Sequence, residues 1–185
     1  MEFESKVFSR ELQQFLYDSG KSLGTAESCT GGRIAEVIIS VPGASNYFKG
    51  SIVAYSNDIK EELLGVDKDM IDQKTAVCEE VAIQMAKGIC DKLHCDYAIS
   101  TTGFAGPAGG TPENPVGTIW IAYGSKDDIR TFKLTENFGR DINLAIATNK
   151  AIRLFYEFMK ETFPDRKLYG DDTNAMNIFP EIGGI

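Results

Sequence analysis

The sequence predicts a single α/β domain of three layers, α/β/α, built on a mixed, mostly parallel sheet of about five strands. Segments with apolar residues at helical spacing alternate along the chain with short apolar runs bounded by turn residues. Two such runs, on either side of Ser125-Lys-Asp-Asp128, are typical of a β-hairpin. A length of 185 residues, with 43% hydrophobic and 25% charged residues, suits one domain with a full core.

The first half of the chain alternates between helical and strand patterns. The predicted elements are a helix at 4–19, a strand at 21–27, a helix at 34–41, a strand at 50–56 and a short helix ending at Leu64. Pro42-Gly43 ends the second helix, because proline cannot continue a helix and glycine readily leaves one.

The second half continues the alternation and then loses it. The predicted elements are a long helix at 81–93, a strand at 97–100, a polar Gly/Pro loop at about 103–116, strands at 117–123 and 129–134, and a last helix at 142–159. From Pro164 onward Asp, Asn, Gly and Pro replace the periodic pattern. We therefore expect a domain at 1–163 and a tail at 164–185 that is either mobile or docked on the surface.

Charge and composition exclude several classes of partner. The net charge of −8 argues against a nucleic-acid partner, but it allows a small anionic ligand bound by a few local donors. No apolar run approaches the length of a membrane span, and the first residues form no signal-peptide core. The cysteines at 29, 78, 90 and 95 contain no Cys-x-x-Cys pair. We expect a reduced, cytoplasmic protein that binds neither nucleic acid nor a membrane.

A turn with several reactive groups follows the first predicted strand, in Thr25-Ala-Glu-Ser-Cys-Thr-Gly-Gly32. Its hydroxyls and thiol would lie beside the N-terminus of the next helix, where free backbone N–H groups favour an anion. Two interpretations compete. In one, Thr30 only caps the helix; in the other, the turn binds an anionic substrate or transition state.

The single histidine limits the catalytic arrangements that this chain can build. His94 ends the long helix, far from any Gly-rich turn, which disfavours a Ser-His or Cys-His arrangement. Cys90 and His94 lie four residues apart, but two ligands on one helix are a weak zinc signal, and ordinary packing is favoured. A lysine with a lowered pKa can replace histidine as a base, and Lys60, just after the second strand, is the best-placed candidate. Spacing alone favours a solvated lysine.

Three hydroxyls are candidates for the nucleophile or for substrate contacts: Ser28, Ser45 and Thr102. Ser45 lies in a tight segment between a helix and the second strand, where a turn or cap role is the plainer interpretation. Ser28 has the same alternative. Cys29 is a candidate thiol near a helix N-terminus, but burial is favoured because no evident base accompanies it.

The third candidate region is the long loop at 101–115, with glycines at 103, 106, 109 and 110. These glycines would let backbone N–H groups approach an anion, although the loop is neither a Walker A motif nor a convincing dinucleotide fingerprint. Loops of this length in compact domains are often functional. Arg140, just before the last helix, is either a phosphate clamp or a surface arginine.

Taken together, these segments resemble the CinA C-terminal domain family. The resemblance rests on Thr25–Gly32, on Tyr55-Ser-Asn57 with Lys60, on Gly65-Val66, on Thr102-Gly-Phe-Ala-Gly-Pro107 with Gly109-Gly110, and on Pro115-Val-Gly-Thr118. It covers about residues 5–160 in the right order. The turn and the Gly-rich segment are highly specific in combination.

Characterised members of that family are nicotinamide-nucleotide amidases. The resemblance therefore implies hydrolysis of the carboxamide of nicotinamide mononucleotide to nicotinate mononucleotide and ammonia, without metal or cofactor, by a stand-alone domain that forms a homodimer or a higher homo-oligomer. It implies Ser45 as nucleophile and Lys60 as base, with Ser28 and Tyr55 in support. The residues that it implies for substrate binding are Thr30, Gly31, Thr102, Gly103, Ala105, Gly106 and Arg140.

Two other interpretations stay open. The domain could bind a pyridine or adenine nucleotide without turnover, or it could hydrolyse a different amide or phosphorylated substrate. The sequence lacks none of the residues that the amidase needs, which favours the amidase over a silent binding module. The lining of the pocket, which would select the substrate, is not specified by any motif.

Overall fold

Five strands form one mixed sheet in the order β2-β1-β3-β4-β5. The computed structural model describes residues 2–165. Its strands are β1 (Leu23–Glu27), β2 (Phe48–Val53), β3 (Tyr97–Gly103), β4 (Ile119–Ser125) and β5 (Asp128–Leu134). β1 pairs in parallel with both β2 and β3, whereas β4 is antiparallel to β3 and to β5. Only β4 therefore opposes the common strand direction in this sheet, which confirms the predicted mixed sheet and its hairpin.

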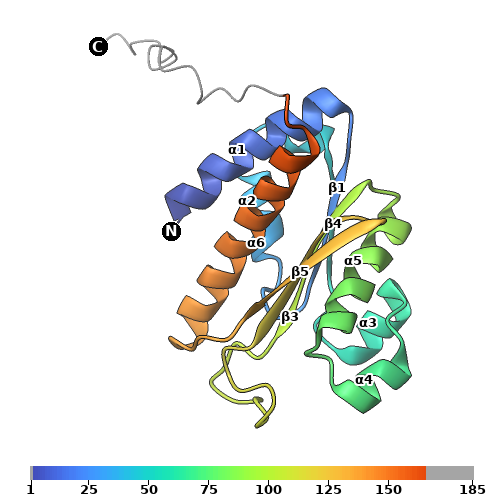
Figure 1. Ribbon diagram of the computed structural model, residues 1–185, viewed down its shortest axis with the longest axis vertical. Helices are drawn as coiled ribbons and strands as arrows, with labels where there is room; N and C mark the ends of the chain where they lie inside the picture. The colour runs from blue at the N-terminus through green and yellow to red at the C-terminus, as the bar shows by residue number, and fades with distance from the viewer. Residues whose placement is uncertain (1, 166–185) are drawn as a thin grey trace.

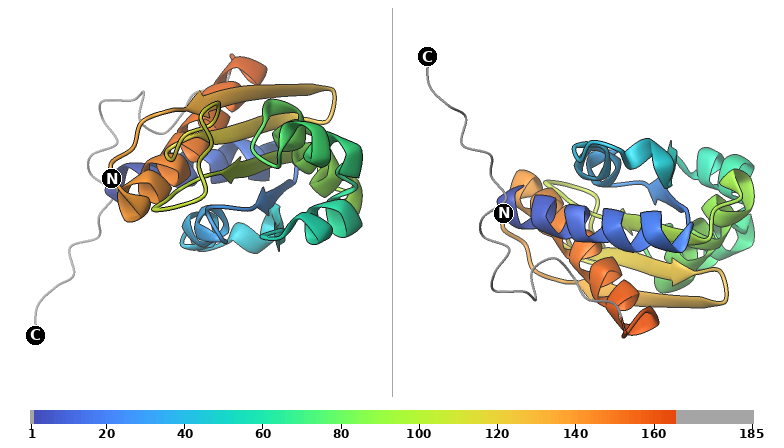
Figure 2. Two further views of the ribbon diagram at one scale, coloured as in Figure 1. Left: turned by 90° about the horizontal axis from the view of Figure 1, so that it is seen from below. Right: turned by 90° about the horizontal axis from the view of Figure 1, so that it is seen from above.

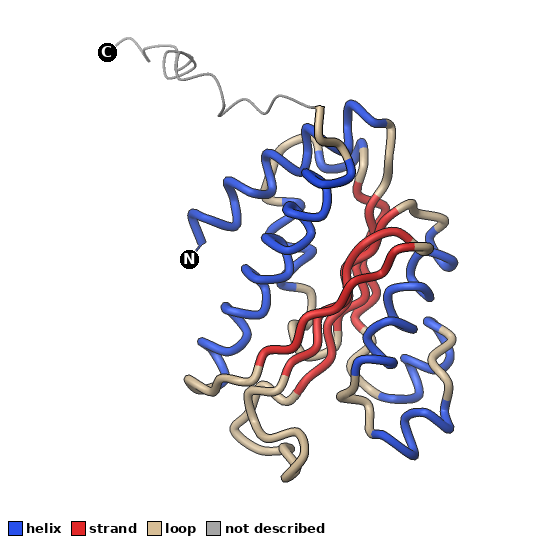
Figure 3. The backbone as a smooth tube through the Cα atoms, viewed as in Figure 1, coloured by secondary structure: helices blue, strands red, loops and turns tan. Residues whose placement is uncertain are grey.

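Helices cover both faces of the sheet and confirm the predicted three layers (Figures 1 and 3). They are α1 (Glu2–Ser19), α2 (Arg33–Ile39), α3 (Asn57–Leu64), α4 (Lys68–Lys74), α5 (Glu79–Leu93) and α6 (Arg140–Thr162), with a short 3-10 helix at Ala44–Asn46. Helices α1, α2 and α6 lie on one face, and α3, α4 and α5 lie on the other (Figure 1).

Strand β2 and helix α4 differ from the sequence prediction. Strand β2 spans 48–53 instead of 50–56, because the carbonyls of residues 54–56 accept hydrogen bonds from Lys60 instead of continuing the ladder. Helix α4 is absent from the prediction, since its seven residues bury only Ile71 and so carry no apolar period. Asp67 marks its start, where the carboxylate accepts a hydrogen bond from the N–H of Asp69 (2.9 Å).

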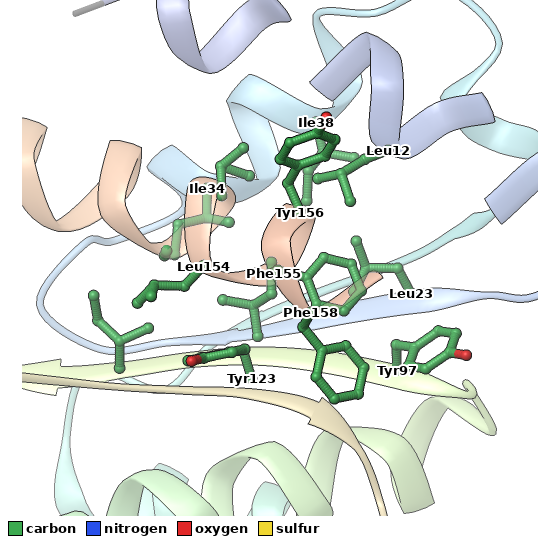
Figure 4. Close-up of a cluster of buried hydrophobic side chains, with 14 of the residues drawn as sticks. Leu12, Leu23, Ile34, Ile38, Tyr97, Tyr123, Leu154, Phe155, Tyr156 and Phe158 are labelled. Carbon is green, nitrogen blue, oxygen red and sulfur yellow. The ribbon is translucent and has the colours of Figure 1, made fainter. Parts of the chain in front are cut away.

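The larger buried cluster lies between the sheet and helices α1, α2 and α6 (Figure 4). Aromatic rings form much of it: the ring of Tyr97 on β3 meets Phe155 and Phe158 of α6 edge-on, with ring centroids 5.8 and 6.1 Å apart. This contact uses the apolar stripe predicted for the last helix. It fixes α6 on the sheet and thereby the position of Arg140, the first residue of α6.

A second cluster lies on the other face, where α5 packs against both the sheet and α3. Gly88 of α5 allows the close approach of α3. A methyl group added at its Cα would lie 1.9 Å from the carbonyl oxygen of Leu64, far inside contact distance. The backbones of α3 and α5 are therefore in direct contact at this point, because Gly88 has no side chain.

The Gly88 contact leads to a stability prediction. In an exposed helix interior, replacing glycine with alanine stabilises by about 1 kcal/mol. Here we expect Gly88→Ala to lower the free energy of unfolding by about 2–3 kcal/mol, because α3 or α5 must shift to admit the methyl group. Urea unfolding measures the change, with Lys87→Ala on the exposed side of the same turn as control, expected within about 0.5 kcal/mol of the wild type. Equal stability of the two variants would contradict the close contact.

The end of the chain is only partly described. The predicted boundary at 163–164 follows directly on α6, which ends at Thr162. From residue 166 onward the predicted tail lies outside the described residues. None of the described helices is long and apolar enough to cross a membrane.

Candidate functional site

The carboxyl ends of the parallel strands β2, β1 and β3 meet at one edge of the sheet, which the left view of Figure 2 shows from below. Three segments continue from these strand ends: the turn 28–32, the segment 54–56 that leads into α3, and the loop 104–118. The first residue of α6 reaches the same edge. Ligands of open α/β sheets bind at the carboxyl ends of parallel strands, so this edge is the candidate site.

Glu27, the last residue of β1, is a fully buried carboxylate that organises the turn after it. The hydroxyls of Thr25 (3.3 Å) and Thr30 (2.7 Å) donate hydrogen bonds to it. Its other partners are three backbone N–H groups at the start of α2, those of Gly32 (2.9 Å), Ile34 (3.1 Å) and Ala35 (2.9 Å). The helix dipole favours a negative charge at this end, so the carboxylate caps α2 from within the fold.

This arrangement corrects part of the prediction for the turn. The N–H groups at the N-terminus of α2 are not free for a substrate anion, because three of them already donate to Glu27. Thr30 is buried, and its hydroxyl lies between Glu27 and the hydroxyl of Thr101 (2.7 Å), so its side chain holds the turn instead of facing a ligand. Gly31 is exposed at a φ of 60°, and its N–H donates to the carbonyl of Ser28 (3.1 Å).

Lys60 of α3 is buried, being only 2% exposed. Its Nζ donates hydrogen bonds to the carbonyl oxygens of Ala54 (2.9 Å), Tyr55 (3.3 Å) and Ser56 (3.4 Å), just past the carboxyl end of β2. No carboxylate of the described residues forms an ion pair with it. Burial lowers the pKa of Lys60 below its ordinary value of 10.5, which favours the neutral amine that can accept a proton. The alternative of a solvated lysine is therefore wrong.

Lys60 is connected to the end of β1, directly before Ser28 and Cys29 of the turn. The connection runs through Ala54, whose carbonyl accepts from Lys60 and whose N–H donates to the carbonyl of Glu27 (2.8 Å). The Cys29 thiol is buried in the core cluster, and this burial raises its pKa to about 12, so it stays protonated. Ser28, which is 8% exposed, is the other candidate nucleophile that the sequence predicts at this edge.

Ser45 lies beyond the amino ends of the parallel strands, at the edge of the sheet opposite the candidate site. It is exposed in the 3-10 helix that precedes the amino end of β2, in a segment tied to α1 by a hydrogen bond from the Gln13 amide to the carbonyl of Pro42 (2.8 Å). Lys60 contacts carbonyls beyond the other end of β2, and a six-residue strand spans roughly 20 Å. Ser45 and Lys60, the dyad that the resemblance implies, therefore lie apart within this chain.

Arg140 joins two of the segments at the site. Its Nη1 donates to the carbonyl of Gly106 (2.9 Å), and its Nη2 donates to the hydroxyl of Tyr55 (3.4 Å). Arg140 and Tyr55 are both exposed, and Arg140 forms no ion pair with the residues that the structure describes. A guanidinium held only by neutral oxygens keeps its charge for a ligand. The position and charge of Arg140 thus fit the predicted phosphate clamp.

Thr102 and Gly103, at the end of β3, have structural partners. The Thr102 hydroxyl is 1% exposed and donates to the carbonyl of Ala76 (2.7 Å), so its side chain faces the protein and not a substrate. Gly103 lies against the start of β4, where an added methyl group would be 2.7 Å from the carbonyl oxygen of Thr118. Both residues shape the loop that follows them.

The model of the CinA C-terminal domain matches residues 5–159. The chain belongs to the CinA C-terminal domain family. The family model covers every element from the greater part of α1 to α6, and with them the turn, Lys60 and Arg140.

Relatives of the CinA family carry general names. A putative competence-damage inducible protein of Halothermothrix orenii is 40% identical over 154 residues, which make up 83% of this chain and 37% of the relative. A CinA-like protein of Thermosipho melanesiensis is 50% identical over 120 residues, or 64% of this chain and 29% of the relative. The chain thus spans little more than a third of the length of the curated relatives it matches.

Solved CinA-family structures share the fold. The competence/damage inducible protein CihA of Agrobacterium tumefaciens has a TM-score of 0.81 at 29% identity, over 84% of this chain and 95% of that one. A CinA superfamily protein of Escherichia coli has a TM-score of 0.79 at 29% identity, over 83% and 90% of the two chains. These likenesses confirm the predicted family and fold class.

Two residues of this CinA-family site are missing from the sequence prediction as functional residues. Glu27 has a signal that points to it, a charged residue inside a strand whose five residues are all buried. Asn143 has none, since a single asparagine on a helix is common. Its amide donates to the carbonyl of Ala105 (3.0 Å) and its oxygen accepts from the N–H of Phe138 (2.8 Å), so it fixes the loop beside Arg140.

The histidine lies away from this edge, as predicted. His94 ends α5 in the left-handed conformation, three residues before β3 begins, and so lies at the amino edge of the sheet. Cys90 and Cys95 beside it are buried. Within residues 2–165, no group of three or more His, Cys, Asp or Glu side chains is placed to hold a metal ion.

Proposed function

We propose that this domain is an amidase that hydrolyses the carboxamide of nicotinamide mononucleotide to nicotinate mononucleotide and ammonia, with Ser28 as nucleophile and Lys60 as base. The main support is the Lys60 amine, which is buried without an ion pair, has a lowered pKa and lies beside the turn that begins with Ser28. A lysine in that state can serve as a base where the site contains no histidine.

The two residues would divide the chemistry as follows. The neutral Lys60 amine takes the proton of the Ser28 hydroxyl while Oγ attacks the carboxamide carbon. Lys60 then gives this proton to the departing nitrogen, so that ammonia leaves and an ester of Ser28 remains. Water attacks the ester while Lys60 accepts its proton and then gives it to Ser28 Oγ, so the acid is released and free Ser28 is restored. The backbone N–H groups of Ser28, Gly31 and Gly32 are already bonded within the fold, so those of Cys29 and Thr30 would bind the developing oxyanion.

Arg140 supplies the specificity for a phosphorylated substrate. Its guanidinium is exposed and unpaired by any described carboxylate, and two neutral oxygens hold it in place. A phosphate could take a bidentate pair of N–H groups from it without displacing a competing anion. The exposed ring of Tyr55, whose hydroxyl holds the guanidinium, would then lie beside the ligand.

This assignment predicts a substrate-dependent effect of Arg140→Gln. We expect its KM for nicotinamide mononucleotide to rise by about 10- to 100-fold, the worth of one charged hydrogen-bonded contact, while kcat changes little. For the unphosphorylated riboside, wild type and variant should have similar KM values. Ammonia release from both substrates measures this. An equal rise for both substrates would contradict the phosphate role.

The same assay tests the function itself. Wild-type protein should release ammonia from nicotinamide mononucleotide at a rate far above that of a Ser28→Ala protein. Calorimetric binding of the nucleotide without any turnover would instead identify a silent binding module. Turnover of another amide, with none of the mononucleotide, would keep the amidase chemistry and overturn the substrate.

A further inference from the structure

Glu27 makes no contact with the reacting groups of the proposed mechanism, yet five donors bind its carboxylate at the base of the turn. We infer that Glu27 is a positioning residue for Ser28, which it holds through a closed ring of hydrogen bonds. This inference rests on the proposed function, in which Ser28 is the nucleophile.

The ring runs through two threonine hydroxyls. Thr30 has a single hydroxyl proton, which it donates to Glu27 Oε2 (2.7 Å), so in the 2.7 Å contact between the hydroxyls of Thr30 and Thr101 the donor is Thr101. The carbonyl of Thr101 in turn accepts from the N–H of Ser28 (2.9 Å). The peptide bond between Glu27 and Ser28 closes the ring, whose other members are at most 2% exposed.

Ser28 is thereby held at both of its backbone polar atoms. Thr101 binds its N–H, and the N–H of Gly31 binds its carbonyl (3.1 Å). With the backbone held, the direction of Oγ depends on the single angle χ1. A nucleophile needs this control, because a displacement of 1 Å can cost about 100-fold in rate.

The capping of α2 shows why the carboxylate is needed. The N-cap residue of α2 is Gly32, at a φ of 98°, and it has no side chain that could bind the free N–H groups. Glu27 reaches them instead from the end of β1. One side chain therefore ties the strand end to the helix start across the turn that holds Ser28, which an ordinary capping side chain within the turn would not do.

Replacing Glu27 with glutamine tests whether the carboxylate itself, and not only a side chain of this size, is needed to position Ser28. The amide has the same size, but its NH2 group faces N–H donors on one side, so α2 loses part of its cap and the ring loses its common acceptor. We expect Glu27→Gln to lower kcat by at least about 100-fold with KM within about three-fold of the wild type. Thr30→Val, which removes only one hydroxyl of the ring, should lower kcat by about ten-fold.

The matched control is Thr148→Val. Thr148 is a buried threonine on α6 whose hydroxyl donates to the carbonyl of Leu144 (2.8 Å), so the variant also loses one buried hydrogen bond. Its thermal midpoint should fall as that of Thr30→Val does, while its kcat stays within about two-fold of the wild type. A loss of rate in Thr30→Val beyond that in this control cannot come from lowered stability.

A second readout does not depend on the natural substrate. A small fluorophosphonate labels an activated serine: the Ser28 Oγ–P bond forms, the P–F bond breaks, fluoride leaves and Lys60 takes the hydroxyl proton. Mass spectrometry of the peptide that contains Ser28 gives the labelling rate. We expect labelling of Glu27→Gln to be at least about 100-fold slower than that of the wild type, and labelling of Thr30→Val to be about ten-fold slower.

The outcomes separate the two proposals. Labelling and kcat of folded Glu27→Gln within about three-fold of the wild type would overturn the positioning role. If Glu27→Gln does not fold, unchanged rates in Thr30→Val would overturn it. Wild-type protein that labels at Ser28 without hydrolysing nicotinamide mononucleotide would overturn the substrate alone. Wild-type protein that does not label at Ser28 would overturn the nucleophile, and the positioning role with it.

Discussion

Replacing Lys60 with methionine is expected to lower kcat by about 10²–10⁴-fold, the usual contribution of a general base, with the fold intact. Methionine fills the same buried space and has no amine to take the Ser28 proton. A Lys60→Arg protein should be equally inactive, because a guanidinium stays protonated at all usable pH values. Activity in either variant would remove Lys60 from the role of base.

The pH dependence of activity provides an independent measure of the same residue. The pKa of Lys60 lies below 10.5 because burial disfavours its ammonium form. In the wild type, log kcat/KM should therefore rise with pH and level off at a value below 10.5, where the free enzyme holds the neutral amine. A profile that is flat across this range would show that no lysine titration limits the reaction.

The stability of the wild type should also depend on pH through Lys60. The folded protein binds the Lys60 proton less tightly than the unfolded chain does, so burial costs stability while the amine is charged in both states. This cost is relieved as pH rises from the folded pKa toward 10.5. The midpoint temperature of the wild type should thus rise relative to that of Lys60→Met as pH increases toward 10.5. Thermal unfolding of both proteins in the same buffers measures the difference.

The fold followed from the sequence because its elements have strong periodic patterns. The apolar stripe of the last helix and the runs of the hairpin each predict an element that the structure contains, α6 and the pair β4 and β5. Helix α4 escaped prediction since seven mostly polar residues contain no apolar period. The early end of β2 coincides with hydrogen bonds from the Lys60 side chain to three carbonyls that lie four to six residues before it, which the apolar pattern does not predict.

The site followed only in part, and strand direction explains the difference. Motif order along the chain placed Ser45 with Lys60, but β2 runs between them and carries them to opposite edges of the sheet. The rule that ligands bind at the carboxyl ends of parallel strands already favours Ser28, which follows β1, over Ser45, which precedes β2. The role of Thr30 depends on a contact with Thr101, 71 residues away, and that of Glu27 depends on hydrogen bonds across the turn to α2, which no local pattern predicts.

Ser28→Ala and Ser45→Ala are therefore expected to differ by several orders of magnitude. Removal of the nucleophile should lower kcat for nicotinamide mononucleotide by more than about 10⁴-fold in Ser28→Ala, since only binding and oxyanion contacts remain. Ser45→Ala should keep kcat within about three-fold of the wild type, because its exposed hydroxyl lies at the far edge of the sheet. Ammonia release under saturating substrate compares the two proteins directly.

The structural cost of the two substitutions is small and similar, so the comparison is a fair one. Each removes a single oxygen, and neither hydroxyl is part of the ring that holds the turn, which uses only the backbone of Ser28. Ser28→Cys adds a further constraint: if Lys60 is the base for this position, the thiol should keep a residual activity that Lys60→Met then abolishes. Full activity in Ser28→Ala with loss in Ser45→Ala would reverse the assignment. Because Ser45 cannot reach Lys60 of its own chain, that result would require a site completed by a second copy.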